Sequence, residues 1–145
     1  MSNLYYLAGP MSNIPQYNYP AFDDAAARLR NLGYAIQSPA EMDSPGTRYR
    51  ALASEDGKLV GGKLAGQTWG DFLSRDVKLL ADKCTGIILL PGWEQSKGAR
   101  LECFIAINSG FPGYKWWPDY GTLVWTSSVE LMNDIHEGVL ADVTR

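Results

Sequence analysis

Apolar residues along this chain occur in two patterns that alternate from the N-terminus onward. Short, nearly continuous apolar runs indicate buried strands, whereas apolar residues repeated every three or four positions indicate helices with one buried face. The short runs predict strands at residues 4–8, 34–37, 86–90 and 123–125. The helical spacing predicts helices at residues 21–32, 69–83, 98–108 and 128–141.

Residues that start and stop helices support these boundaries. Pro20 precedes the first predicted helix and Gly33 follows it. Capping boxes begin at Thr68 and Ser127, where a hydroxyl residue is followed three positions later by an acid. Strands that alternate with helices predict an α/β fold, in which a doubly wound, mostly parallel sheet of about five strands carries helices on both faces. We expect a single domain over residues 1–145, because no segment has the composition of a linker.

Two segments show neither pattern. Residues 40–67 are irregular and rich in glycine, which favours a mobile flap over a site, with a small hairpin at 58–64 as a further possibility. Residues 111–120 are aromatic and rich in proline and glycine, which favours an exposed loop. Such a loop would form a subunit interface or a wall for ring stacking, and we expect the interface.

Composition and charge exclude several classes of function. The 145 residues are 46% hydrophobic and 20% charged, as in globular domains, and the net charge of −3 gives no footprint for a nucleic-acid polymer. No apolar run is long enough to span a membrane, and no secretion signal is visible. Cys84 and Cys103 lack metal-ligand spacing, so we expect buried thiols in a reducing, cytoplasmic compartment. Because His136 is the only histidine, carboxylates are the expected acid–base groups, with no metal or cofactor.

Two carboxylates occupy unexpected positions in the helical pattern. Glu102 is the only charged residue between Leu101 and Ile107, near the start of its predicted helix. Asp76 falls within the apolar stripe of the preceding helix. Each is either an acid at the edge of a stripe that reaches water, or a buried carboxylate with a function. We expect the N-terminus of its helix to help keep Glu102 ionised.

Motifs around these acids resemble those of the nucleoside 2-deoxyribosyltransferase family. Its relatives include the 2′-deoxynucleoside 5′-monophosphate N-hydrolases and related, often phage-borne, proteins. The resemblance covers roughly residues 4–110 and rests on Asp76 in its helix and on two motifs, Tyr6-Leu7-Ala8-Gly9-Pro10 and Lys97-Gly98-Ala99-Arg100-Leu101-Glu102. It implies a flavodoxin-like fold and a homo-oligomer without a cofactor.

The resemblance also implies roles for individual residues. Glu102 matches the nucleophile that attacks C1′ of deoxyribose, and Asp76 matches the acid that binds the sugar and handles the leaving base. Tyr6 matches the tyrosine that hydrogen-bonds the nucleophile, and Tyr5 should point to the opposite face of the sheet. The remaining substrate-binding positions that we expect are Ala8, Gly9, Pro10, Met11, Ser96 and Gly98.

Two departures from the family pattern leave the substrate open. Ser96 stands where the transferases carry an aspartate, and the monophosphate hydrolases have a serine there that contacts phosphate. The Gly9-Pro10 turn instead resembles the transferases, and Pro10 has no N–H to donate. We therefore expect deoxyribose transfer between nucleobases, with hydrolysis of deoxynucleoside monophosphates as the alternative. In either case activity should fall as pH drops through the pKa of Glu102.

Two further classes remain open. Residues 91–102 weakly resemble the Pro-Gly-Gly-x-Gly-Thr-x-x-Glu motif of the lysine-decarboxylase-like phosphoribohydrolases, although the spacing is longer and the threonine is absent. The other class is a nucleotide-binding protein without catalytic activity. It predicts that Glu102→Ala leaves function intact, whereas the enzymatic interpretations predict loss of turnover.

Overall fold

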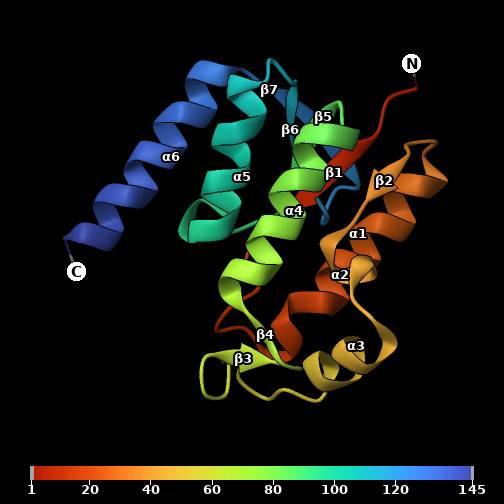
Figure 1. Cartoon of the computed structure of the whole chain (residues 1–145). Helices are drawn as coiled ribbons and strands as arrows, with labels where there is room; N and C mark the ends of the chain where they lie inside the picture. The colour runs from red at the N-terminus through yellow and green to blue at the C-terminus, as the bar shows by residue number, and fades with distance from the viewer. Residues whose placement is uncertain (1, 145) are drawn as a thin grey trace.

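A five-stranded sheet with the strand order β2-β1-β5-β6-β7 forms the centre of the molecule (Figure 1). The computed structural model describes residues 2–144. The first four strands in this order are parallel, and β7 runs antiparallel to β6. The strands of this sheet are β1 (Tyr5–Ala8), β2 (Ile36–Gln37), β5 (Gly86–Leu89), β6 (Gly113–Trp117) and β7 (Thr122–Thr126).

Helices cover both faces of this sheet, with α1, α2 and α3 on one side and α4, α5 and α6 on the other (Figure 1). The α-helices are α1 (Tyr19–Asn31), α2 (Pro39–Met42), α3 (Pro45–Leu52), α4 (Trp69–Lys83), α5 (Lys97–Asn108) and α6 (Ser128–Val143). The shorter elements are the 3-10 helices η1 (Pro15–Asn18) and η2 (Trp93–Gln95) and the hairpin strands β3 (Lys63–Leu64) and β4 (Gln67–Thr68). The predicted α/β class and mostly parallel five-stranded sheet are confirmed, and the strand order is that of a flavodoxin-like fold.

Alternation along the central strands divides the core into two apolar layers. In β1, Leu7 faces α1 and packs with Phe22 and Leu29, whereas Tyr6 faces the side covered by α4 and α5. Tyr5 lies on the α1 side and packs edge-to-face against Tyr34 and Tyr114, which places it opposite Tyr6 as predicted. The tip of β1 therefore directs the Tyr6 hydroxyl toward α5.

The prediction that residues 40–67 are irregular is wrong, because two short helices and the β3–β4 hairpin lie there. Ser44 caps α3 by accepting a hydrogen bond from the Thr47 N–H, and Pro45 occupies the first helical position. The Pro45-Gly46 pair is typical of a turn, but here Ser44-Pro45 starts a helix. The hairpin spans residues 63–68 rather than the expected 58–64.

The prediction of a loop at residues 111–120 is also wrong, because β6 occupies residues 113–117. Pro112 and Pro118 flank this strand, and Trp116 is buried in the core beneath the Arg28 guanidinium. Trp117 and Tyr120 remain exposed, so their contribution to a subunit interface stays a prediction. None of the helices within residues 2–144 is long and apolar enough to cross a membrane.

Gly57 joins the segment after α3 to the loop after β1. The Asn13 N–H donates to the Gly57 carbonyl at 2.9 Å, and the Gln16 N–H donates to the Ser54 carbonyl at 2.8 Å. Gly57 has a φ of +67°, and a Cβ at this position would lie 2.0 Å from the Ile14 carbonyl oxygen. Only glycine fits this junction, which holds the two segments together on one side of the fold.

We expect Gly57→Ala to lower the free energy of unfolding by about 2 kcal/mol or more, because the methyl group displaces Ile14 as well as straining the backbone. Gly61→Ala is the matched control: Gly61 has a φ of +60°, and no atom lies within 4 Å of the point that a Cβ would occupy. Its cost should be the backbone strain alone, about 1 kcal/mol. Urea unfolding of both variants measures the difference, and equal losses would contradict the contact with Ile14.

Candidate active site

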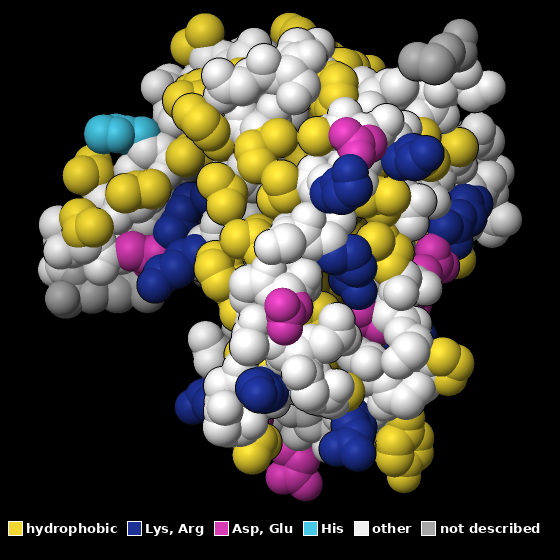
Figure 2. All heavy atoms as spheres, in the orientation of Figure 1, with side chains coloured by type: hydrophobic (Ala, Val, Ile, Leu, Met, Phe, Trp, Pro, Cys, Tyr) yellow, Lys and Arg dark blue, Asp and Glu magenta, His cyan; other side chains and the backbone are white. Residues whose placement is uncertain are grey.

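A cavity of about 440 Å³ lies beyond the carboxyl ends of β1 and β5. Its walls come from residues 9–13 after β1, from α4, from the N-terminal half of α5, from the segment that carries α2 and β3, and from Asp142 of α6. In the space-filling view the surface is indented between the end of α6 and the β3–β4 hairpin (Figure 2). This is the edge at which doubly wound folds bind ligands.

Glu102 lies on the α5 wall of the cavity and is buried, with 6% of its surface exposed. The hydroxyl of the fully buried Tyr6 donates a hydrogen bond of 2.6 Å to Glu102 Oε2. Burial and the neighbouring charge of Asp76 raise the pKa of Glu102 to about 8, although the Tyr6 hydrogen bond and the Arg75 charge oppose the shift. Burial and the Glu102 charge likewise raise the pKa of Tyr6 well above its ordinary value, so Tyr6 remains a proton donor.

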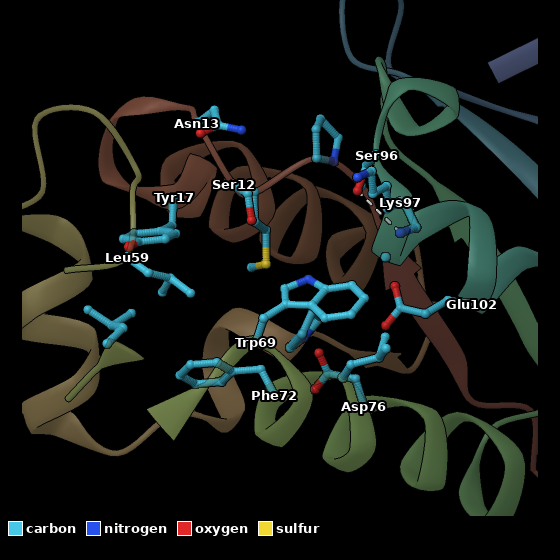
Figure 3. Close-up of a pocket in the computed structure, with 18 of the residues that line it drawn as sticks. Ser12, Asn13, Tyr17, Leu59, Trp69, Phe72, Asp76, Ser96, Lys97 and Glu102 are labelled. Carbon is cyan, nitrogen blue, oxygen red and sulfur yellow. Dashed lines mark hydrogen bonds between the residues drawn. The ribbon is translucent and has the colours of Figure 1, made fainter. Parts of the chain in front are cut away.

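Asp76 lies on the facing wall, which α4 forms, and is also buried (Figure 3). Its Oδ1 accepts from the Arg75 guanidinium, with Nη2 at 2.8 Å and Nε at 2.9 Å. Burial raises the pKa of Asp76 to about 6, and the Arg75 charge limits the rise. The structure thus brings Asp76 and Glu102 to the wall of one cavity, and places Tyr6 directly behind Glu102 within hydrogen-bond distance.

The structure does not support the expectation that the N-terminus of α5 keeps Glu102 ionised. Ser96 caps the helix by accepting from the Ala99 N–H at 3.2 Å, whereas Glu102 lies in the second turn, beyond the unpaired N–H groups. Burial and the Asp76 charge, which raise the pKa of Glu102 to about 8, favour a protonated Glu102 at neutral pH. The structure corrects the expected charge of this residue.

The predicted substrate-binding positions divide into two groups. Five of them line the cavity, whereas Ala8 lies buried within the sheet and does not reach it. Gly9 also has a packing role, because a Cβ there would lie 2.9 Å from Leu90 Cβ. The five lining residues are Gly9, Pro10, Met11, Ser96 and Gly98.

Sequence reasoning missed a charged group beneath the acids. Arg75 bridges Asp76 and Asp43, and the Tyr19 hydroxyl donates to the other oxygen of Asp43. All four residues line the cavity. Arg75 is adjacent to Asp76 in the sequence, which is the only local signal for its role. Asp43 lies in the segment that was expected to be irregular, so its partner was not apparent.

An apolar wall faces the space in front of the acids. Trp69 and Phe72 project from α4 into the cavity, and Tyr17 and Leu59 lie at its other end (Figure 3). None of residues 111–120 lines this cavity, so the aromatic side chains in its wall are not those of the predicted ring-stacking segment but come from α4 and η1. Planar heterocycles stack on surfaces of this kind.

The remaining reactive side chains do not form a second catalytic group. Cys84 and Cys103 are free and buried as predicted, and burial raises the pKa of their thiols to about 11 and about 12. Within residues 2–144, no group of three or more His, Cys, Asp or Glu side chains is arranged to hold a metal ion. Asp76 and Glu102 are acids in the cavity wall whose pKa values are raised toward neutrality.

The fold and the cavity define a class: a flavodoxin-like α/β protein with two buried carboxyl groups at the ligand-binding edge of its sheet. The family described as "Domain of unknown function (DUF4406)" matches residues 3–112, and the chain belongs to that family. The match includes Tyr6, Asp76 and Glu102 and ends before β6. No curated protein sequence matches the chain.

The buried carboxyl groups make the stability of the fold depend on pH. Glu102 and Asp76 both have raised pKa values in the folded protein, so the folded state binds more protons than the unfolded state between about pH 4 and pH 8. Their contribution to the free energy of unfolding is therefore complete at low pH. It is lost as pH rises through their pKa values in the folded protein, about 6 for Asp76 and about 8 for Glu102.

We expect Glu102→Gln to stabilise the fold on the order of 2 kcal/mol at pH 8 and by much less at pH 5. The amide avoids burying a charge and can still accept the hydrogen bond from Tyr6. Urea unfolding at the two pH values measures the change. A gain that is the same at pH 5 and pH 8 would show that Glu102 does not have a raised pKa in the folded protein.

Proposed function

We propose that this protein cleaves the N-glycosidic bond of 2′-deoxynucleosides and transfers the deoxyribose to a second nucleobase. The observation that carries the proposal is the buried Glu102 carboxyl group, which Tyr6 holds at 2.6 Å and which shares a cavity with Asp76. The resemblance of these positions to the nucleoside 2-deoxyribosyltransferase family supplies the reaction. The membership of the chain in a family of unknown function neither supports nor opposes it.

The reaction begins with nucleophilic attack on the sugar. Ionised Glu102 attacks C1′ while the C1′–N bond breaks through an oxocarbenium-like transition state, and a glycosyl ester forms on Glu102. The electrons of the broken bond pass to the base nitrogen, which accepts a proton. A second base then attacks C1′, its N–H proton passes to the ionised Asp76, and the ester bond breaks to regenerate the Glu102 carboxylate. Attack by water in the same position gives hydrolysis instead.

The two carboxyl groups together supply the proton that the leaving base needs. With one proton on the pair, Glu102 becomes a nucleophile when its proton moves to Asp76, and Asp76 then protonates the departing nitrogen. The lower pKa of Asp76, about 6 against about 8, makes this transfer unfavourable by a modest amount that a catalytic step tolerates. Tyr6 keeps one oxygen of Glu102 hydrogen-bonded throughout, which fixes the direction of attack.

The apolar wall supports a nucleobase as the leaving group and acceptor. Trp69 and Phe72 lie on the same helix as Asp76, about two turns and one turn before it, so a base stacked on them is held near the acid that protonates it. Trp69 has 46% of its surface exposed, and a stacked ring would cover it.

One observation favours the monophosphate N-hydrolase as the second candidate. The N-terminus of α5 faces the cavity with Ser96, Lys97 and Gly98 in its wall, and a helix N-terminus with a nearby lysine suits a phosphate. Against a phosphate, Pro10 in the cavity wall has no backbone N–H to donate, and Asp142 in the same wall is an acid whose charge is already paired with Arg100. We therefore retain transfer from a nucleoside as the proposal.

The proposal is tested by chromatography of the purified protein with deoxynucleosides and deoxynucleoside monophosphates, each with and without a second free base. We expect exchange of bases, with Glu102→Ala slowing turnover at least about a thousandfold because no nucleophile remains. Glu137→Gln, which changes an exposed acid on α6, is the control and should retain activity. Free base without exchange would support the hydrolase, and binding without turnover would support a nucleotide-binding protein.

We expect the rate to depend on pH with two limbs, because only the singly protonated pair is active. Below about pH 6 both carboxyl groups are protonated and the nucleophile is lost, whereas above about pH 8 no proton remains for the base. The measurement is kcat/KM from about pH 4.5 to about pH 9.5, which spans both limbs. A rate that stays constant on the alkaline side would contradict a shared proton and leave Glu102 as a simple ionised nucleophile.

A further inference from the structure

The floor of the cavity contains a buried chain of charges that ends on Asp76. The Tyr19 hydroxyl donates to Asp43, Asp43 pairs with Arg75, and Arg75 pairs with Asp76. The Asp43 side chain is only 3% exposed, and that of Arg75 is 27% exposed. A buried aspartate beside an arginine needs a specific reason, because each isolated charge is costly to remove from water.

The guanidinium of Arg75 is already occupied on all three nitrogens. Nε and Nη2 contact Asp76, Nη1 contacts Asp43, and Nη2 also lies 3.4 Å from the Pro39 carbonyl oxygen. Its central carbon is 5.5 Å from the centre of the Phe72 ring, which restricts it further. An arginine held in this way is not available to bind a ligand anion, so its partner is Asp76 itself.

We propose that Arg75 is a positioning residue for the reaction: it is the fixed counter-ion that keeps Asp76 charged and thereby places the single proton of the pair on Glu102. The role rests on the proposed function. Asp43 and Tyr19 hold the guanidinium in place from the end of α2 and from α1. When a substrate enters, the proton has one defined starting position and one defined route, from Glu102 through Asp76 to the base.

The charges around Asp76 come from every element that packs against it. Arg75 of α4 lowers the pKa of Asp76, whereas Asp43, which directly follows α2, raises it. Tyr6 of β1 donates to Glu102 of α5 and also lowers the pKa of Asp76, and Lys97 lies on the cavity wall at the start of α5. Arg75 is the cation in direct contact with the Asp76 carboxylate within the described residues 2–144. Its removal should therefore change the titration of Asp76 more than any other single cation.

The test is a carbon-13 NMR titration of the Asp76 side-chain carboxyl group in the ligand-free protein. We expect Arg75→Met to raise the titration midpoint of Asp76 by about 1–2 pH units. Arg75→Lys keeps the charge but loses the paired contacts, so we expect a smaller rise. If Arg75→Met does not fold, a rise in Arg75→Lys still supports the proposal, and no change in that variant overturns it.

Arg30→Met is the matched control. Arg30 of α1 pairs with Glu41 of α2 at 2.6 Å and so also joins α2 to another helix, but its hydrogen bonds go to Glu41 and Ile36 and not to the network around Asp76. An unchanged Asp76 titration in this variant supports the proposal, whereas a shift as large as that of Arg75→Met would assign the effect to general loss of charge. A change in the NMR chemical shift of Arg75 Nε on addition of inorganic phosphate would also overturn the proposal, because the guanidinium would then be a ligand-binding group.

The titration needs no substrate, so it separates this inference from the proposed function. If Arg75→Met shifts the titration of Asp76 but the protein cleaves no nucleoside, the counter-ion role of Arg75 is supported and the proposed reaction is wrong. Conversely, if the protein exchanges bases but Arg75→Met leaves the titration of Asp76 unchanged, the proposed reaction is supported and the counter-ion role of Arg75 is wrong. In an active protein, the acidic limb of the rate profile should move by the same amount as the titration of Asp76.

Discussion

The hydrogen bond from the Tyr6 hydroxyl to Glu102 is the interaction on which the site depends. It joins the central strand β1 to helix α5 through two buried side chains, 2.6 Å apart, where the apolar core meets the Asp76–Arg75 pair. Without that donor, one oxygen of the carboxyl group would be buried with no partner, which costs about 1–3 kcal/mol. The bond therefore fixes where the carboxyl group points and makes its burial tolerable.

The parallel sheet makes this bond possible. Residues 6 and 87 are paired in register on β1 and β5, and the chain leaves both strands at the same edge of the sheet. The loop from β5 passes through η2 into α5, which carries Glu102 back across the tip of β1. Helix α4 approaches the same edge and brings Asp76 and its arginine. Two acids from different helices therefore meet in one electrostatic environment, in which neither titrates as an isolated group.

Much of this arrangement could be predicted from the residues alone. The strands at the centre of the sheet have no charged residues, a capping box marks α4 and the Ser127 cap marks α6, so the α/β class and these elements followed from local signals. Asp76 and Glu102 stood out because they interrupt apolar helix faces. The network around Arg75 could not be found in this way, since Asp43 reaches it only through tertiary packing of a segment without regular spacing. The raised pKa of Glu102 could not be predicted from the sequence either, because it depends on how completely the folded protein excludes water from the carboxyl group.

The antiparallel hairpin of β6 and β7 has a consequence for the wall of the cavity. It turns the chain back so that α6 packs on η2, where Gly138 lies so close that a Cβ would be 2.1 Å from the Glu94 carbonyl oxygen. Arg100 anchors the far end of α6 through Asp142, at 2.5 Å. The family match ends at residue 112, yet Asp142 forms part of the cavity wall. Both buried acids thus lie within the matched residues, while part of the cavity wall comes from a helix outside them, so a change in α6 can alter that wall without a change in either acid.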